Sequence, residues 1–272
     1  DFVGSRGLGD VYKRQKHIVA RAFSTVRTNF KFGAPGLGDR IHHILFAYNY
    51  SVMENTPVTL HLTKYQWNRN KPESWPEILS LFPDNRVKVI PHLDYEPKHN
   101  KDFLNFVKGL GYSNAEEHIY KDHPQKYEPK EGIDLTKYLK MFPQVKAEDC
   151  TKDLKLPKNF ITVQFDSTSK SRMMKQKNRQ DILEKYKNYE KIIVGGESKN
   201  ELLKNSLKHI AYAMSKAKHH VGVDSGFFHM SQVYFSPKNI HIYTTRHPKK
   251  WSHHMQRARD NGIFINGRDK KL

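Results

Sequence analysis

Cysteine is almost absent from this sequence, and long apolar runs are absent altogether. The 272 residues contain one cysteine, Cys150, so an internal disulfide is excluded and no cysteine spacing of the zinc-binding kind exists. No uninterrupted apolar run approaches the roughly 20 residues that a membrane span requires, which excludes an integral membrane protein. We therefore expect a cytoplasmic protein in a reducing compartment.

Acidic residues are also scarce. The chain has 47 Lys and Arg against 28 Asp and Glu, a net charge of +19, and 12% of its residues are aromatic. Residues 156–272 hold 23 basic and 9 acidic residues, a net charge of +14 that leaves +5 for residues 1–155. The aromatic supply excludes wholesale disorder. The charge predicts a polyanionic partner, which is a nucleic acid, an anionic membrane surface or the phosphates of a small ligand.

The first fifteen residues differ from the rest. Residues 10–15 resemble a translated sequencing adaptor, a contaminant of metagenomic reading frames, so we interpret residues 1–15 as an artefact without structure. The chain that follows divides by its pattern into an N-terminal domain, residues 16–155, and a C-terminal domain, residues 156–272. The segment from Tyr112 to Lys155 gives no clear pattern, and truncation after Leu272 stays open.

Strands and helices alternate along both domains, which predicts parallel βαβ units and an α/β fold. In such sheets, ligands bind beyond the carboxyl ends of the strands. The predicted strands are 23–27, 58–62, 87–90, 160–165, 191–194, 220–223 and 240–243, and the predicted helices are 39–48, 74–82, 101–110, 179–186, 202–216 and 226–235.

The first loop that follows a strand is rich in glycine and ends in an acid. Gly36 and Gly38 would let a ligand approach the backbone closely. Asp39 follows them at a predicted helix N-cap, where it would stabilise the helix by about 1 kcal/mol. The same carboxylate could instead accept a proton as a general base. The loop alone favours the cap.

Two further loops carry candidate ligand-binding groups. Lys170 and Arg172 follow the strand at 160–165, where they suit a phosphate or form a solvated basic loop. Asp224, Ser225 and Gly226 follow the strand at 220–223 and open a helix, whose first amides would favour an anion.

The segment 222–230, GVDSGFFHM, resembles the G-x-D-[ST]-G-x-x-H signature of the family 9, heptosyltransferase-like glycosyltransferases. That family also has a Gly-Asp pair that opens its first helix, matched by Gly38 and Asp39, and a strand-Gly-x-Glu segment, matched by residues 194–197. Lys170 lies where a phosphate-binding lysine is expected. The order of these four short matches carries the resemblance.

The resemblance implies a GT-B fold, with two Rossmann-like domains that face each other across a cleft. It implies an inverting, metal-independent hexosyl or heptosyl transfer from a nucleotide-sugar to an acceptor hydroxyl. Gly36 and Gly38 would lie near the substrates. Residue by residue, it implies a general base at Asp39, sugar contacts at Asp224, diphosphate contacts at Ser225, Gly226 and Lys170, a nucleoside contact at Glu197, and a donor-site position of unassigned contact at His229.

We expect no metal and no cofactor, because the histidine pairs at 42–43, 219–220 and 253–254 have no accompanying carboxylate or cysteine. The expected acceptor is a saccharide or a lipid-linked hydroxyl, and peripheral association with an anionic inner membrane face stays open. The alternatives are a nucleotide-sugar epimerase of the same fold, which would turn over its donor without an acceptor, and a basic nucleic-acid-binding protein, which would bind in a salt-dependent way. No nucleic-acid motif is present, so no nucleic acid is expected.

Overall fold

The computed structural model divides the chain into two compact units. The first unit comprises residues 1–36, 42–79 and 84–141, and the second comprises residues 37–41, 80–83 and 142–272. Residues 142–155 thus lie with the second unit, whereas the sequence-based domain boundary at residue 156 stays a prediction. The structure describes residues 15–19, 37–63, 75–82, 84–95, 100–119, 132–167, 170–195, 206–244 and 253–266.

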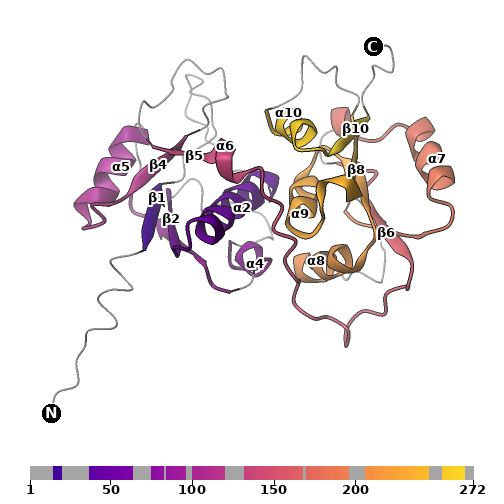
Figure 1. Cartoon of the computed structure of the whole chain (residues 1–272), viewed down its shortest axis with the longest axis horizontal. Helices are drawn as coiled ribbons and strands as arrows, with labels where there is room; N and C mark the ends of the chain where they lie inside the picture. Colours follow the sequence, from indigo (N-terminus) through magenta and orange to yellow (C-terminus); the bar gives the residue numbers. More distant parts are fainter. Residues whose placement is uncertain are drawn as a thin grey trace. The chain divides into compact units, whose positions relative to one another are not determined.

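The first unit contains a five-stranded parallel sheet in the order β3-β2-β1-β4-β5. Residues 41–49 of α2 are all buried, including the polar His42, His43 and Asn49. Figure 1 shows the sheet with its helices. The elements are β1 (Lys16–Val19), α2 (Leu37–Met53), β2 (Val58–Thr63), α4 (Trp75–Leu79), β3 (Val87–His92), α5 (Asn100–Gly109), β4 (Glu116–Ile119), β5 (Ile133–Asp134) and α6 (Leu135–Tyr138).

Three histidines form a hydrogen-bonded row across the first sheet. His17 Nδ1 lies 3.0 Å from His61 Nε2, and His61 Nδ1 lies 2.9 Å from His92 Nε2. The rings of Phe103 and Phe106 contact His92 edge-on. Because the rings are buried together, burial lowers the pKa of all three histidines, and that of His61 falls to about 3.

The second unit contains a five-stranded parallel sheet in the order β10-β9-β8-β6-β7. Strands β6 and β8 are neighbours although β7 lies between them in the sequence, so the strand order reverses at this point. The elements are β6 (Phe160–Val163), η1 (Lys170–Arg172), α7 (Gln176–Lys185), β7 (Glu190–Ile193), α8 (Leu207–Lys216), β8 (His220–Val223), α9 (Gly226–Tyr234), η3 (Pro237–Asn239), β9 (Ile240–Tyr243), α10 (His253–Asp260) and β10 (Phe264–Asn266).

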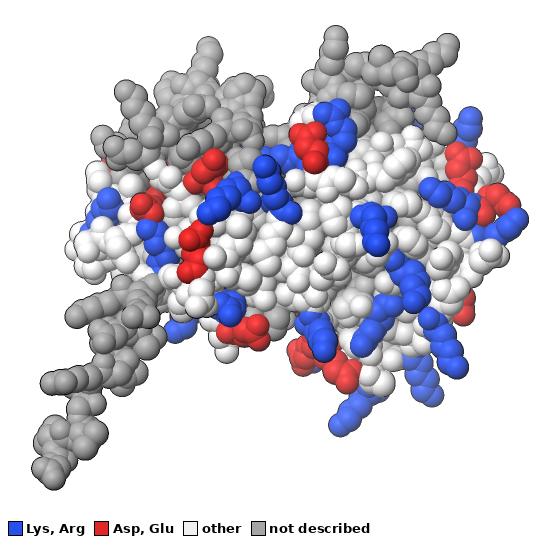
Figure 2. Space-filling view, viewed as in Figure 1, with Lys and Arg blue, Asp and Glu red and all other residues white. Residues whose placement is uncertain are grey.

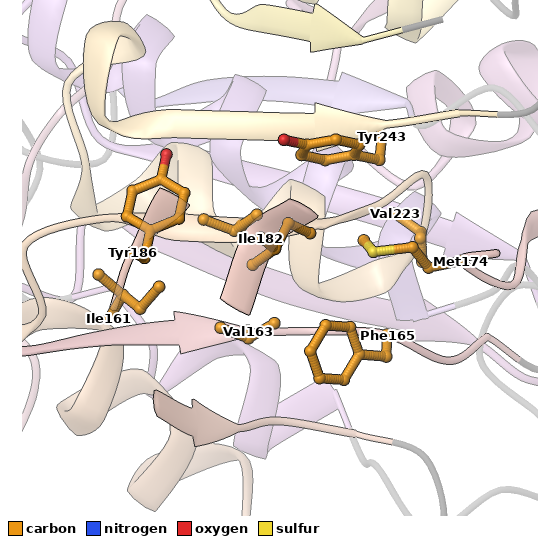
Figure 3. Packing of buried hydrophobic residues seen from close by; sticks show 9 residues of the cluster. Ile161, Val163, Phe165, Met174, Ile182, Tyr186, Val223 and Tyr243 are labelled. Atoms are coloured by element: carbon orange, nitrogen blue, oxygen red, sulfur yellow. The ribbon is translucent and has the colours of Figure 1, made fainter. Parts of the chain in front are cut away.

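The two faces of the second sheet differ in polarity. Ile161, Val163 and Val223 pack with Ile182 of α7 in an apolar cluster (Figure 3). Successive side chains of a strand point to opposite faces, so Thr162 lies on the other face, which α8 and α9 cover (Figure 1). That face carries the buried polar residues Thr162 and His220.

Most predicted elements of the second unit are confirmed to within a few residues, and β8 and β9 match their predicted bounds. The strand at 240–243 is not the last one, because α10 and β10 follow it. The unassigned segment contains β4, β5 and α6. The predicted strand 23–27 lies outside the described residues.

Asp39 does not occupy the N-cap of α2, contrary to the expectation from the sequence. The helix begins two residues earlier, at Leu37, which places Asp39 third in the first turn. The side chain of Leu37, the first residue of the helix, packs against Gly226.

No helix in the described part of the chain combines the length and the apolar character needed to cross a bilayer.

Candidate functional site

The carboxyl edge of the second sheet is the candidate site. Gln164 follows β6 and Asp224 follows β8, the two strands between which the strand order reverses. A reversal separates the loops that follow the two strands and so opens a crevice, which is where α/β sheets of this kind bind ligands. The fold therefore directs attention to these two loops.

The side-chain amide of Gln164 connects the loops. It is almost fully buried, and its Nε2 donates to the carbonyl oxygen of Asp166 at 2.9 Å. Its Oε1 accepts a hydrogen bond from the hydroxyl of Ser225. The backbone N–H of Gln164 donates to the carbonyl of Val221 at 2.8 Å. Since both ends of the amide are engaged, the loops after β6 and β8 are held in fixed register.

Ser225 occupies the N-cap of α9 in an extended conformation. Its hydroxyl makes no capping hydrogen bond and donates to Oε1 of Gln164. The first N–H groups of a helix have no partner within the helix. The start of α9 thus offers backbone donors and a positive dipole end that Ser225 does not occupy.

Residues 37–41, the first turn of α2, belong to the second unit, and there Gly38 lies directly against the start of α9. A methyl group on Gly38 would come 2.5 Å from Cδ2 of His229 and 3.3 Å from Cα of Gly226. Conversely, a methyl group on Gly226 would come 3.1 Å from Cδ2 of Leu37. The close approach leaves no room for a side chain at Gly38 and little at Gly226, and it brings two helix N-termini side by side.

The loop after β7 reaches the same edge. Gly195 has φ +73°, a conformation that favours glycine. A methyl group there would come 2.5 Å from Cε2 of Phe227 and 3.6 Å from Nε2 of Gln164. Phe227 therefore fills the space between the loops that follow β7 and β8.

Two basic side chains follow β6. Arg172 is half-buried, and its Nη1 donates to the carbonyl oxygen of Asp224 at 3.3 Å. Lys170 is exposed in the single turn η1. Arg179 forms an ion pair of 2.6 Å with Asp166, which fixes the base of this loop. Positive charge thus lies beside Asp224, which is itself only 7% exposed.

His220 contributes no charge to the site, because its imidazole is buried and stays neutral. The side chain is fully buried in β8, with Nδ1 3.1 Å from the hydroxyl of Thr162. Burial lowers the pKa of His220 to about 3. The ring is neutral at pH 7, so the positive potential near the site comes from arginine, lysine and the helix amides.

The structure brings together a subset of the residues predicted from the sequence. Asp224, Ser225, Gly226, His229 and Gly38 lie at or beside the start of α9. Gly36 and Glu197 lie outside the described residues, and nothing is described of the Asp39 side chain.

Sequence reasoning missed Gln164 and Phe227, and it gave Arg172 only an accessory place. Gln164 reads as the end of an apolar strand, and Phe227 reads as an ordinary residue in a helix. A polar residue directly after a buried strand is the signal that could have singled out Gln164.

Comparison with known proteins gives a shared fold. No protein-family model matches the chain, and no curated protein matches its sequence. Among solved structures, E. coli ADP-heptose LPS heptosyltransferase II is similar with a TM-score of 0.51 and 12% identity, over 92% of this chain and 90% of that one. A glycosyltransferase of family 9 from Veillonella parvula gives 0.48 and 11%, over 93% and 85%.

The chain also matches the dodecameric, iron-containing glycosyltransferase TibC of enterotoxigenic E. coli, with a TM-score of 0.45 and 9% identity over 85% of this chain, and it spans 58% of the TibC chain. The similarity to heptosyltransferase II extends over both units. The chain has that α/β fold of two Rossmann-like units, as expected from the resemblance. The cleft between the units stays a prediction.

Proposed function

We propose that this protein is a glycosyltransferase that moves a hexosyl or heptosyl group from a nucleotide-sugar donor to an acceptor hydroxyl. The observation that carries the proposal is the contact of Gly38 with Gly226 and His229. It joins the two motifs of the sequence resemblance, which lie nearly 190 residues apart. Such a contact is expected if both motifs serve one site.

The donor diphosphate would bind at the start of α9. Backbone amides from Ser225 onward offer donors to an anion, and Arg172 and Lys170 supply charge from the loop after β6. Asp224 would accept hydrogen bonds from sugar hydroxyls, and Glu197 would contact the nucleoside. The helix N-termini and the basic side chains replace the cation that bridges the diphosphate in metal-dependent transferases, so added magnesium or manganese should leave turnover unchanged.

The experiment that tests donor binding is calorimetric titration with nucleoside diphosphates. Lys170→Ala and Arg172→Ala should each weaken binding by about tenfold or more, because each removes a charged partner of a phosphate. Lys175→Ala is the matched control, since Lys175 is also exposed and lies just beyond the loop. Equal affinity in all three variants would remove the basic loop from the site.

Asp39 would act as the general base toward the acceptor. Asp39→Asn retains the shape of the side chain but removes proton acceptance at neutral pH. Turnover should fall by roughly 100-fold or more, as for other general bases, while donor affinity stays close to normal. Near-normal turnover would restrict Asp39 to a helix-stabilising role.

The acceptor would be a saccharide or a lipid-linked hydroxyl. In Figure 2, basic side chains predominate over the surface that the second unit forms, which is consistent with the +14 of residues 156–272. Such a surface would hold the protein weakly at an anionic membrane face. Co-sedimentation with anionic vesicles should occur at low salt and disappear at high salt. Consumption of the donor without any acceptor would instead indicate an epimerase.

A further inference from the structure

Three side chains that commonly bind metals meet in the second unit, and none of them is assigned to the donor site. Cys150, Asp153 and His209 each place one ligand atom within 4.8 Å of the others. Cys150 is the single cysteine of the chain. The group is therefore a mixed sulfur, oxygen and nitrogen cluster that cysteine spacing in the sequence cannot indicate.

A short turn and a helix create the cluster. The N–H groups of Asp153 and Leu154 both donate to the carbonyl oxygen of Cys150 at 2.9 Å, which folds the segment into a turn. His209 comes from the first turn of α8. The side chains of Cys150 and Asp153 thus project from one turn toward one residue of the helix.

Two further contacts fix this segment on α8. Lys208 forms an ion pair with Glu148, and the hydroxyls of Thr151 and Tyr212 lie 2.8 Å apart. Lys208 and Tyr212 lie on either side of His209 in α8, and Thr151 lies between Cys150 and Asp153. The positions of the three ligand atoms are therefore set by the fold and do not depend on an ion.

The three side chains differ in burial and in hydrogen bonding. The Cys150 thiol is fully buried and donates a weak hydrogen bond to the carbonyl oxygen of Glu148, at 3.6 Å, whereas the Asp153 carboxylate is 51% exposed. His209 Nε2 lies 3.5 Å from Asp153 Oδ2, which exceeds a good hydrogen bond, and its Nδ1 is buried without a partner. Burying polar groups in this way is unfavourable unless something satisfies them.

We propose that Cys150, Asp153 and His209 bind a divalent transition-metal ion, with Zn²⁺ as the ion that this ligand set fits best. Zinc takes thiolate, imidazole and carboxylate ligands, and a fourth position would hold water. On binding, the thiol S–H bond breaks, a sulfur–zinc bond forms and the proton passes to the buffer. The bound ion would connect the segment that precedes β6 to α8.

Cobalt is the probe for the test, because a thiolate bound to Co²⁺ gives a charge-transfer absorption that carboxylate and imidazole ligands do not give. Titration of the metal-free full chain with Co²⁺ should produce this absorption with one ion per chain, and Zn²⁺ should abolish it. Zn²⁺ should also raise the melting temperature of the wild type.

Single variants assign the ligands. The absorption should be absent in Cys150→Ser. In His209→Gln and Asp153→Asn, the apparent affinity for Co²⁺ should fall at least tenfold. The controls Asp181→Asn and His219→Gln, which lie outside the cluster, should behave as wild type. If Cys150→Ser does not fold, Co²⁺ titration of His209→Gln and Asp153→Asn still tests the proposal. An absent thiolate absorption, or one unchanged in His209→Gln, would overturn the proposal.

Discussion

The two sheets bury their polar side chains differently. In the first sheet, His17, His61 and His92 bond to one another across three strands and end against aromatic rings. In the second sheet, the pair of Thr162 and His220 lies on the same face as Gln164, which extends the polar row to the carboxyl edge. Sheets of one fold type thus use buried polarity in two ways, as a closed network and as a support for a site.

Lowering the pH should produce the largest of the predicted changes in the free energy of unfolding. His61 and His220 are buried with pKa values lowered to about 3, against 6.5 for an exposed histidine. Between these values the unfolded chain binds protons that the folded chain does not. The free energy of unfolding therefore falls as the pH drops below about 6.5, by up to about 1.4 kcal/mol per pH unit for each group.

The variants His61→Gln and His220→Gln separate the two sheets. Urea unfolding at pH 7, 6 and 5 should give a shallower loss of stability with falling pH in each variant than in the wild type. If both variants kept the wild-type slope, the two histidines would not be the groups that titrate on unfolding.

The strands that the sequence predicts well are those with continuous apolar runs. Phe160–Val163 and His220–Val223 are buried on both faces. The second strand matches its predicted bounds, and the first ends two residues before the predicted end at 165. The strand Glu116–Ile119 begins with two acids, and Ile133–Asp134 has only two residues, so neither leaves a periodic signal. Helix His253–Asp260 is mostly polar and escapes detection for the same reason.

The candidate site was predictable where backbone geometry sets the residue type. Ser225 and Gly226 mark a helix start, and Gly38 marks a close approach, which glycine alone permits. The role of Gln164 was not predictable, because it depends on a hydrogen bond with Ser225, 61 residues away in the sequence. Local patterns reveal where a loop begins, whereas the partner across the loop is set by tertiary packing.

Alanine substitution of two glycines should give the next largest difference in the free energy of unfolding. A methyl group on Gly222 would come 2.8 Å from Nε2 of His220 and 3.3 Å from Cβ of Gln164, whereas one on Gly109 would contact nothing within 4 Å. Gly222→Ala should lower the free energy of unfolding by about 1–3 kcal/mol through overpacking. Gly109→Ala, at the end of α5, should raise it by up to about 1 kcal/mol, since alanine favours the helix.

Denaturant titration of both variants checks this pair. The crowding in the second sheet would be disproved by a Gly222→Ala protein as stable as the wild type. Weaker nucleoside-diphosphate binding in the same variant would tie the packing of Gln164 to the donor site.

A matched pair of tyrosine hydroxyls gives the smallest effect. Tyr138 donates to Oε1 of Glu54 at 2.8 Å in the first unit, and Tyr186 bonds to Nδ1 of His241 in the second. Glu54 is partly exposed and keeps its ion pair with Lys137, so water can replace the hydroxyl. Tyr138→Phe should therefore lower the free energy of unfolding by about 0.5–1.5 kcal/mol.

Tyr186→Phe leaves the half-buried ring of His241 without its partner, which raises the expected loss to about 1–3 kcal/mol. Burial lowers the pKa of His241 to about 4, so the ring is neutral at pH 7 and its Nδ1 must find a new hydrogen-bond partner. Chemical denaturation at pH 7 measures both losses under one condition. A larger loss for Tyr138→Phe than for Tyr186→Phe would reverse the ranking and show that exposure at Glu54 does not compensate for the lost hydroxyl.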